Sequence, residues 1–225
     1  SPAHGDTCPD QTLQNAMSVA RDKGLPWQTH LSQTVIEFQE TVRRTGMTPI
    51  QRMDRLGVLC GNATIVHGIF TDQHSWTNWH TRDDLAILAT TGTTLVQCPV
   101  AMERIGHRLE SFGGYRRAGI NLALGTDVQP ANMLEEMRAA MINSRTASGN
   151  IADVTAADAF NAATIGGAAA LLRDDIGRLG QGMRADLVLV DLTGPAMRPL
   201  RDPLRNLIYT AADRAIRHVY VDGNQ

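Results

Sequence analysis

The sequence predicts an α/β fold in which the strands of a parallel sheet alternate with helices. The first observation behind this prediction is a set of short, nearly continuous apolar runs at 63–67, 94–98 and 120–124. Strands that are apolar on both faces are typical of parallel sheets, which helices cover on each side. The second observation is that helix-like segments separate these runs, giving four strand–helix units before residue 150. Four such units are half of an eight-stranded barrel.

The first helix is predicted over residues 10–23, because its apolar side chains recur at helical spacing and Gly24 follows as a stop signal. A strand over 26–30 comes next. A second helix is predicted over 34–44, and a third over 48–56, where a Thr-Pro pair has the composition of a helix start.

The same alternation continues after the apolar run that ends near residue 67. The sequence predicts a helix over 81–91 and a strand over 94–98, which a proline ends. A helix around 111–118 leads to the strand over 120–124, and a longer helix runs from Pro130 to about Ser144.

The last third of the chain has a different texture. An alanine-rich helix is predicted over 155–172, and glycine-marked turns then precede strands within 176–192 and 216–225. We interpret residues 1–175 as part of a barrel domain and residues 176–225 as part of a small β domain.

Composition and charge exclude several classes of partner. The chain of 225 residues has a formal net charge of -2, which gives no reason to expect nucleic acid or an anionic membrane as a partner. No apolar run approaches the roughly 18 residues that a membrane span needs. The three cysteines, Cys8, Cys60 and Cys98, form no Cys-x-x-Cys pair and indicate reduced thiols in a cytoplasmic protein. We therefore expect a small-molecule substrate.

Three polar side chains end three predicted strands: His30, His67 and Asp127. Singly, each has a plainer interpretation, because a strand-end histidine is often a hydrogen-bonded core residue and Asp127 could be a helix N-cap. Together they lie at one edge of a parallel sheet, where barrel enzymes place catalytic groups. Imidazole and carboxylate bind Zn²⁺ or Fe²⁺, and such a metal lowers the pKa of bound water to about 7. The pattern predicts a metal site that activates water.

The loop over 73–80 contains two more histidines, His74 and His80, and two tryptophans. Six residues separate the histidines, which is not a same-face helical spacing, so we favour a loop wall or a pocket lid over a second metal site. The tryptophans could pack over an aromatic or alkyl substrate or could anchor the loop. The sequence indicates no partner for the remaining histidines, which are His4, His107 and His218.

A series of short motifs follows one order along nearly the whole chain. They are His30-Leu31-Ser32-Gln33-Thr34, Val66-His67-Gly68, Gln97-Cys98-Pro99, and the stretches 118–127, 133–138, 161–164, 182–191, 202–204 and 218–223. Together they resemble the amidohydrolase superfamily, and within it the cytosine-deaminase-like group that includes triazine (atrazine) chlorohydrolases.

The resemblance implies a (β/α)8 TIM-type barrel, of which this chain resembles strands 5–8, with part of a small β-sandwich domain. It implies one divalent metal ion, zinc or else iron, with His30 and Asp127 as ligands. Asp127 would also accept the proton of the water, and His67 would hydrogen-bond the metal-bound hydroxide or the substrate. In the family this hydroxide attacks an electrophilic carbon, and an amine, a halide or a similar group leaves. Relatives are commonly dimers or larger, so a homo-oligomer is expected.

Two departures from the family pattern matter. Relatives carry a His-x-His pair on strand one, and none of the seven histidines here forms one. The sequence also begins without Met and stops in a turn after a strand, so we expect a fragment that lacks the first half of the barrel. The second departure is Gln33, which stands where relatives have a glutamate that protonates the leaving nitrogen. An amide cannot transfer a proton, and Glu37, one helical turn further on, is an alternative acid.

These observations predict a metal-dependent hydrolase that cleaves a C–N or similar bond of a small heterocyclic or carbamate-like molecule. Gln33 would contact the substrate, and Ala101-Met102 after the Cys-Pro motif indicates a more apolar pocket than in relatives. One alternative is an aminohydrolase (deaminase) in which another group replaces the missing acid. The other is a non-catalytic member of the family that only binds a ligand.

Overall fold

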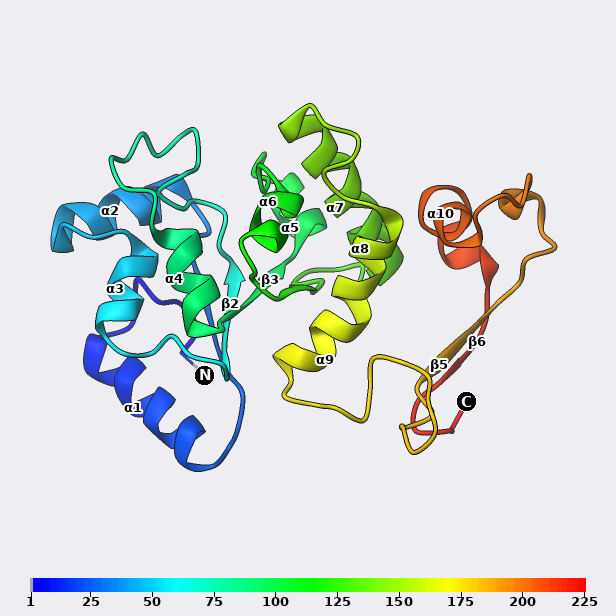
Figure 1. The fold of residues 1–225 in the computed structure, drawn as a ribbon, viewed down its shortest axis with the longest axis horizontal. Coiled ribbons are helices and arrows are strands. Elements are labelled where there is room, and N and C mark those ends of the chain that lie inside the picture. Colours follow the sequence, from blue (N-terminus) through cyan, green and yellow to red (C-terminus); the bar gives the residue numbers. More distant parts are fainter. Residues whose placement is uncertain (1) are drawn as a thin grey trace.

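The computed structural model describes residues 2–225, and its centre is a parallel sheet of four strands (Figure 1). The strands are β1 (Trp27–Leu31), β2 (Ala63–His67), β3 (Thr94–Gln97) and β4 (Leu122–Leu124), and they pair in that order. Parallel neighbours need crossover connections, and helices provide them. This arrangement confirms the predicted α/β fold with parallel strands.

Helices precede, connect and follow the strands of the sheet, largely where the sequence predicts them. In order they are α1 (Asp10–Asp22), α2 (Val35–Thr45), α3 (Pro49–Arg55), α4 (Asp84–Thr91), α5 (Pro99–Glu103), α6 (Phe112–Arg117), α7 (Met133–Ser148), α8 (Ala156–Asn161) and α9 (Gly167–Ala170). Thr34 and Thr48 cap α2 and α3 with their side chains. Helix α5 was not predicted: Pro99 ends a strand as expected, but it also takes the first position of a five-residue helix.

The alanine-rich segment 155–172 is not the single helix that the sequence predicts. A π-helical turn over Ala162–Gly166 lies between α8 and α9. At this turn the backbone packs directly on β4, because a Cβ atom at Gly166 would lie 2.1 Å from the carbonyl oxygen of Leu122. The change of helical pitch therefore coincides with a contact that only glycine permits.

Two apolar clusters hold the sheet and its connections. The larger one packs side chains of α1, α3, α4, α6 and α7 against the strands and includes Trp27, Ile65 and Leu95. The second gathers near the carboxyl ends of the strands and includes Phe38, Phe70 and other buried residues, namely Val66, Ile69, Cys98, Ala101 and Met102. Full burial of a side chain of this size contributes about 1.5–3 kcal/mol to the stability of the fold, so this cluster stabilises the carboxyl ends of the strands.

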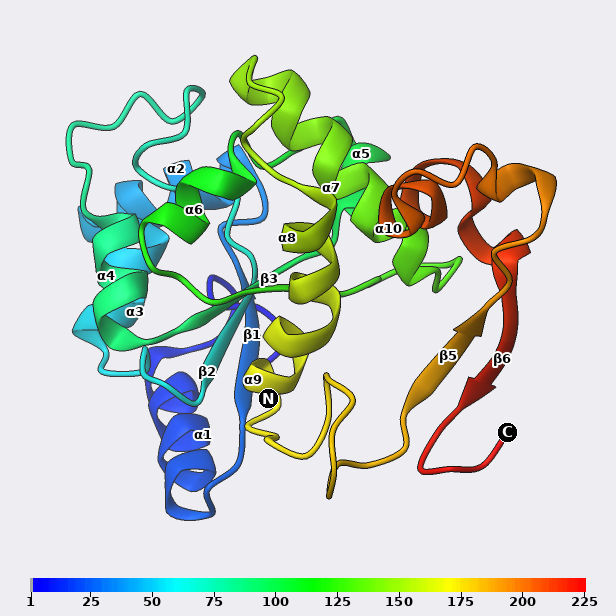
Figure 2. The same ribbon diagram turned by 45° about the vertical axis from the view of Figure 1, so that its right-hand side comes forward.

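The C-terminal part forms an antiparallel pair of strands, β5 (Leu187–Val190) and β6 (Ile216–Tyr220), as the sequence predicts. Between them lies a helical stretch that the sequence does not predict. It consists of a 3₁₀ turn (Pro195–Met197), α10 (Pro203–Asn206), a π-helical turn (Leu207–Ala211) and a second 3₁₀ turn (Ala212–Ala215). The strand pair stands to one side of the parallel sheet, and α10 lies beside α7 (Figure 2).

Across residues 2–225, none of the helices combines the length and the apolar character that crossing a lipid bilayer requires.

Candidate active site

The three polar residues that end predicted strands meet at one edge of the sheet. His30 lies near the end of β1, His67 ends β2, and Asp127 follows β4 by three residues. Nε2 of His30 is 3.9 Å from Oδ1 of Asp127, and Nε2 of His67 is 4.0 Å from Oδ2 of Asp127. The two imidazole ring centroids are 5.3 Å apart. Parallel pairing explains the cluster, since it brings the carboxyl ends of neighbouring strands to the same edge.

The ring of His30 is oriented by the N-terminal segment. Its Nδ1 lies 2.6 Å from the carbonyl oxygen of Ala3, which can only accept, so Nδ1 carries the proton and Nε2 offers a lone pair toward Asp127. Backbone bonds from Gly5 N to His30 O and from His30 N to Ala3 O fix this segment along β1. A carbonyl that holds one ring nitrogen while the other faces outward is the usual support of a metal-ligating histidine.

His4 also belongs to this cluster, although the sequence indicates no partner for it. Its ring stacks on that of His30 with a centroid distance of 4.8 Å. Sequence analysis misses the contact because His4 precedes the first predicted helix and pairs with β1 only through an isolated bridge. The only feature of the sequence that points to this contact is the presence of a histidine at position 4.

His67 is fully buried, with no exposed surface. Within residues 2–225 neither of its ring nitrogens has a hydrogen-bond partner, which is rare for buried polar atoms. Burial lowers the pKa of His67 to about 4, against the opposing effect of Asp127, so the ring is neutral at pH 7. The side-chain amide of Gln97 donates to the His67 carbonyl oxygen and fixes the backbone.

Asp127 points into the cluster from a left-handed backbone conformation, with φ of 57°. Just before it, a Cβ atom at Gly125 would lie 3.1 Å from Val96, so glycine lets the chain pass close to β3. The N-cap interpretation of Asp127 is wrong: α7 starts at Met133, and its cap is Asn132, whose side chain accepts from the N–H groups of Leu134 and Glu135. The carboxylate of Asp127 is therefore not used as a cap.

Gln33 and Glu37 lie beyond the tip of β1. Gln33 is half-buried in the turn that leads from β1 into α2. Both carboxylate oxygens of Glu37 accept backbone N–H groups, one from Ser32 and one from Gln33, each at 2.7 Å. Burial raises the pKa of Glu37 to about 7, against those two hydrogen bonds. This carboxylate serves the backbone of the turn, so the geometry does not favour it as a replacement for the acid.

The remaining histidines pack among aromatic side chains rather than joining the cluster. His74 is buried beside Phe70, at a centroid distance of 4.5 Å, and its Nε2 lies 4.0 Å from Glu110. Exposed His80 packs on Trp79 at 4.3 Å, and Trp79 meets the edge of Phe38. This packing agrees with a loop wall, and both tryptophans contact phenylalanine rings, with Trp76 against Phe70.

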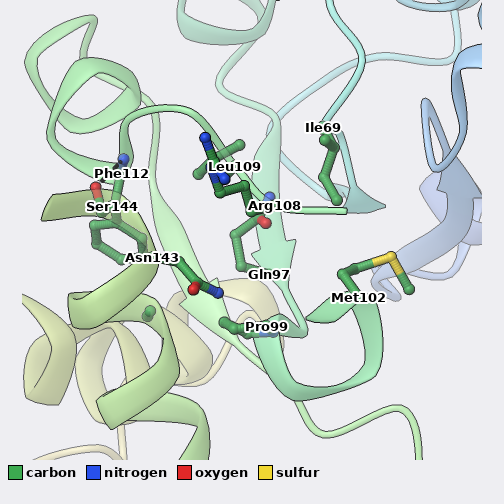
Figure 3. A pocket seen from close by; sticks show the side chains of 10 residues that line it. Ile69, Gln97, Pro99, Met102, Arg108, Leu109, Phe112, Asn143 and Ser144 are labelled. Atoms are coloured by element: carbon green, nitrogen blue, oxygen red, sulfur yellow. Dashed lines mark hydrogen bonds between the residues drawn. The ribbon is translucent and has the colours of Figure 1, made fainter. Parts of the chain in front are cut away.

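A small cavity lies near the strand ends but is too small for a substrate. Its volume is about 20 Å³, room for roughly one water molecule. Figure 3 shows the side chains that line it, among them Gln97, Arg108 and Asn143. Gln97 lines this cavity and also donates its side-chain amide to the carbonyl oxygen of His67.

The spacing of the cluster can be compared with that of the ligands of a metal ion. In the portion of the chain that the structure describes, no three His, Cys, Asp or Glu side chains converge closely enough to hold a metal ion. Two ligand atoms of a tetrahedral ion, each at about 2.1 Å from it, lie about 3.4 Å apart. Nε2 of His30 and Oδ1 of Asp127 lie 3.9 Å apart, which is near this spacing and too long for a hydrogen bond, so this pair fits two ligands of one ion.

Comparison with known proteins agrees with the motifs. A sequence model described as the amidohydrolase family matches residues 2–225. The 5-methylthioadenosine/S-adenosylhomocysteine deaminase of Symbiobacterium thermophilum is 34% identical over 96% of this chain and 49% of its own length. The enzyme of that name from Halobacterium salinarum is 30% identical, again over 96% of this chain and 49% of its own. The chain thus spans about half the length of these curated relatives.

Solved structures show the same fold. An adenosine deaminase from Xanthomonas campestris, solved with bound zinc, superposes with a TM-score of 0.90 at 30% identity, over 99% of this chain and 50% of its own. Atrazine chlorohydrolase from Arthrobacter aurescens, complexed with zinc, superposes with a TM-score of 0.84 at 22% identity, over 99% of this chain and 48% of its own. The parallel sheet and its helices therefore correspond to part of a larger domain of the TIM-barrel type.

Proposed function

The chain belongs to the amidohydrolase family, and from this membership we propose that it is part of a metal-dependent hydrolase. The reaction would cleave a C–N or similar bond of a small heterocyclic or carbamate-like molecule. The observation that carries the proposal is the meeting of His30, His67 and Asp127 at the carboxyl edge of the sheet. The names of the relatives, which include deaminases and a chlorohydrolase, support a heterocyclic substrate.

His30 and Asp127 would hold one divalent metal ion, together with ligands that this chain does not contain. Zinc is the metal we propose, because two of the similar structures were solved with it, and iron is the alternative. When bound, such an ion lowers the pKa of a coordinated water to about 7. Asp127 would accept the proton of the attacking water, and neutral His67 would hydrogen-bond that water or the substrate.

Gln33 would contact the substrate without transferring a proton, since an amide donates and accepts hydrogen bonds but does not ionise. This favours a leaving group that needs little protonation. Deamination is the second candidate function, because the curated relatives and one similar structure are deaminases. Release of ammonia from a panel of aminated and halogenated heterocycles separates the two reactions.

We further propose that residues 1–175 belong to the barrel, and that residues 176–225 belong to a small β-sandwich domain completed by strands outside this chain. The antiparallel pair β5–β6 supports the second assignment. The free thiols of Cys8, Cys60 and Cys98 support a reducing, cytoplasmic setting. A homo-oligomer remains an expectation from the family.

The proposed reaction is tested by Asp127→Asn in the full protein that contains this chain, loaded with zinc. Removing the proton acceptor should lower kcat by about 10²–10⁴-fold. Asp54→Asn, on an exposed face of α3, is the matched control and should leave kcat unchanged. If Asp127→Asn keeps full metal-dependent turnover, the assignment of Asp127 is wrong. A non-catalytic binding member would show no turnover even without the substitution.

A further inference from the structure

The backbone that follows His67 is attached to the backbone that follows His30. The carbonyl oxygen of Leu31 accepts the N–H of Gly68 at 3.0 Å. The next carbonyl, that of Ser32, accepts two N–H groups, from Ile69 at 2.9 Å and from Phe70 at 3.0 Å. The exit of β1 thus determines where the exit of β2 lies, and any shift at Ser32 is passed to His67.

Ser32 holds this position in an unfavourable conformation. Its φ is 54°, in the left-handed region, which costs a non-glycine residue about 1–3 kcal/mol unless its surroundings impose it. The residue has no exposed surface, and its hydroxyl has no hydrogen-bond partner within residues 2–225. The side chain of Ser32 therefore does not hold the turn.

Glu37 is the side chain that does so. It is only 8% exposed, and its two oxygens take the N–H groups of Ser32 and Gln33, each at 2.7 Å. Its own N–H donates to the capping hydroxyl of Thr34 at 3.1 Å, which fixes Glu37 in the first turn of α2. One side chain with two acceptor oxygens thus holds two neighbouring N–H groups of the turn, and we call this two-point contact the clamp.

We propose that Glu37 is a positioning residue for the reaction: by holding the N–H groups of Ser32 and Gln33, it fixes the distance between His30 and His67 and the direction of Gln33. The effect of Glu37 on catalytic turnover rests on the proposed function. Its effect on the backbone over residues 32–33 does not. Glu37 touches neither the metal ligands nor any reacting atom, so it acts only through the backbone of the turn.

The test compares Glu37→Gln with Glu40→Gln in the full, zinc-loaded protein. Glutamine keeps the size of the side chain but offers one acceptor where two are needed. Hydrogen exchange at the amides of Ser32 and Gln33 should accelerate at least about tenfold, and kcat per zinc-loaded molecule should fall about 10–100-fold, with KM within about threefold. Exposed Glu40, one turn along α2, forms a surface ion pair with Arg43, and its replacement should change neither value.

A second variant, Glu37→Asp, separates geometry from charge. Aspartate keeps the charge but is one methylene too short to reach both amides, so it should behave as Glu37→Gln does. It also serves if Glu37→Gln does not fold. Three results would each overturn the proposal. One is full turnover in Glu37→Asp, and another is unchanged hydrogen exchange at Ser32 and Gln33 in Glu37→Gln. The third is faster exchange at these amides with an unchanged kcat.

Zinc affinity keeps this test independent of the proposed function. If the unsubstituted protein turns over no heterocycle, the proposed function fails, but a metal competition titration still reports on the turn. In that case Glu37→Gln should weaken zinc binding about tenfold relative to Glu40→Gln, because residues that orient metal ligands typically contribute that much. Equal zinc affinity of the two variants would then overturn the role of Glu37.

Discussion

At the scale of single residues, His30 and His67 have different surroundings, which support the different roles that we propose for them. His30 is oriented through Nδ1 by a backbone carbonyl, and it exposes 27% of its side chain beside Asp127. His67 has no partner among the described residues and no exposed surface. The first arrangement suits a metal ligand, and the second suits a group that meets a water or a substrate atom held next to it.

Substituting each histidine should separate these tasks. His30→Asn should lower zinc affinity by at least about tenfold. His67→Asn should retain zinc while lowering kcat about 10²-fold, the usual range for loss of a group that assists proton transfer. Metal analysis and steady-state kinetics of the full protein measure both, and exposed His80→Asn is the control. Loss of zinc in His67→Asn but not in His30→Asn would reverse the assignment.

Asp84 provides a residue-scale prediction about pH. Burial raises the pKa of Asp84 to about 7, although Thr48 donates to its Oδ1 at 2.6 Å and the N–H of Asp72 donates to its Oδ2 at 2.8 Å. In the unfolded chain the pKa of an aspartate is about 3.9. Between about pH 4 and 7 the folded state therefore holds a proton that the unfolded state releases, and this contribution to stability is lost as pH rises.

We therefore expect the unsubstituted protein to lose stability relative to Asp84→Asn between pH 5 and pH 8. The difference between their melting temperatures should move by several degrees, since 1 kcal/mol corresponds to about 2–4 °C for a domain of this size. Burial also raises the pKa of Glu37 to about 7, but its effect on stability is the same in both proteins and drops out of the difference. Asp54→Asn, on the exposed face of α3, should follow the unsubstituted protein at every pH. A pH-independent difference for Asp84→Asn would contradict the argument.

The sequence predicts the meeting of His30, His67 and Asp127 because a single rule suffices: parallel strands present their carboxyl ends at one edge. It does not predict the stacking of His4 on His30 or the clamp of Glu37. Both are contacts between segments that follow no strand or helix period. Such contacts depend on how the chain turns after a strand, which local composition does not specify.

At the scale of elements, the strands and most helices agree with the sequence prediction to within a few residues. The helix predicted over 155–172 is the main exception, since a π-helical turn divides it. The smaller disagreements have local causes. Helix α4 starts at Asp84 rather than at Thr81, because Asp72 accepts from the Thr81 hydroxyl and from the Asp83 N–H and holds these residues in the turn. The short helices α5 and α10 have too few residues to show a periodic apolar pattern.

Helix α6 shows how such a short element is held from outside. Asp153, which is 1% exposed, accepts from the hydroxyls of Ser111 and Ser144, from the N–H of Gly113 and from Arg117. Burial opposes ionisation, but the hydrogen bonds from Ser144, Ser111 and Arg117 lower the pKa of Asp153 below its usual value. This carboxylate therefore joins the start of α6 to α7.

Replacing Asp153 by Asn should cost about 2–4 kcal/mol, because the amide cannot accept from all of these donors and leaves some of them buried and unpaired. Chemical denaturation at pH 7 measures this. Since the pKa is lowered in the folded state, the stabilisation is present above about pH 4 and is lost as pH falls further, so the difference should shrink in acid. Asp175→Asn breaks only a surface ion pair with Arg173 and should cost less than about 1 kcal/mol. Equal losses of unfolding free energy in the two variants would show that the hydrogen bonds around Asp153 contribute no more than a surface ion pair.

At the scale of the whole molecule, the parallel sheet and the C-terminal strand pair differ in burial. The strands of the sheet are almost entirely buried, whereas β5 and β6 have no buried residue. Their apolar side chains are largely open to solvent, with Val188 49%, Leu189 47% and Val219 49% exposed. A two-stranded antiparallel pair is at best marginally stable by itself, so the two parts should differ in local stability.

Hydrogen exchange of the 225-residue chain should show this difference directly. Amides within β5 and β6 should exchange at least about 10²-fold faster than those of β2 and β3, because opening them exposes little new apolar surface. Mass spectrometry of peptides that cover 187–190 and 216–220, against 63–67 and 94–97, makes the comparison. Uniform protection across all four segments would mean that β5 and β6 are as firmly held as the sheet.

The left-handed conformations at Ser32, His67 and Asp127 stand at the tips of three strands, and each lies where glycine would be the more comfortable residue. Three of the seven non-glycine residues with positive φ among residues 2–225 thus lie in or beside the proposed site. Substitutions that raise the melting temperature at these positions should therefore lower turnover, and the residues that turnover needs should lower the melting temperature. Selection of variants by melting temperature alone would therefore favour substitutions at the strand tips. The selected proteins would be more stable and would turn over substrate more slowly.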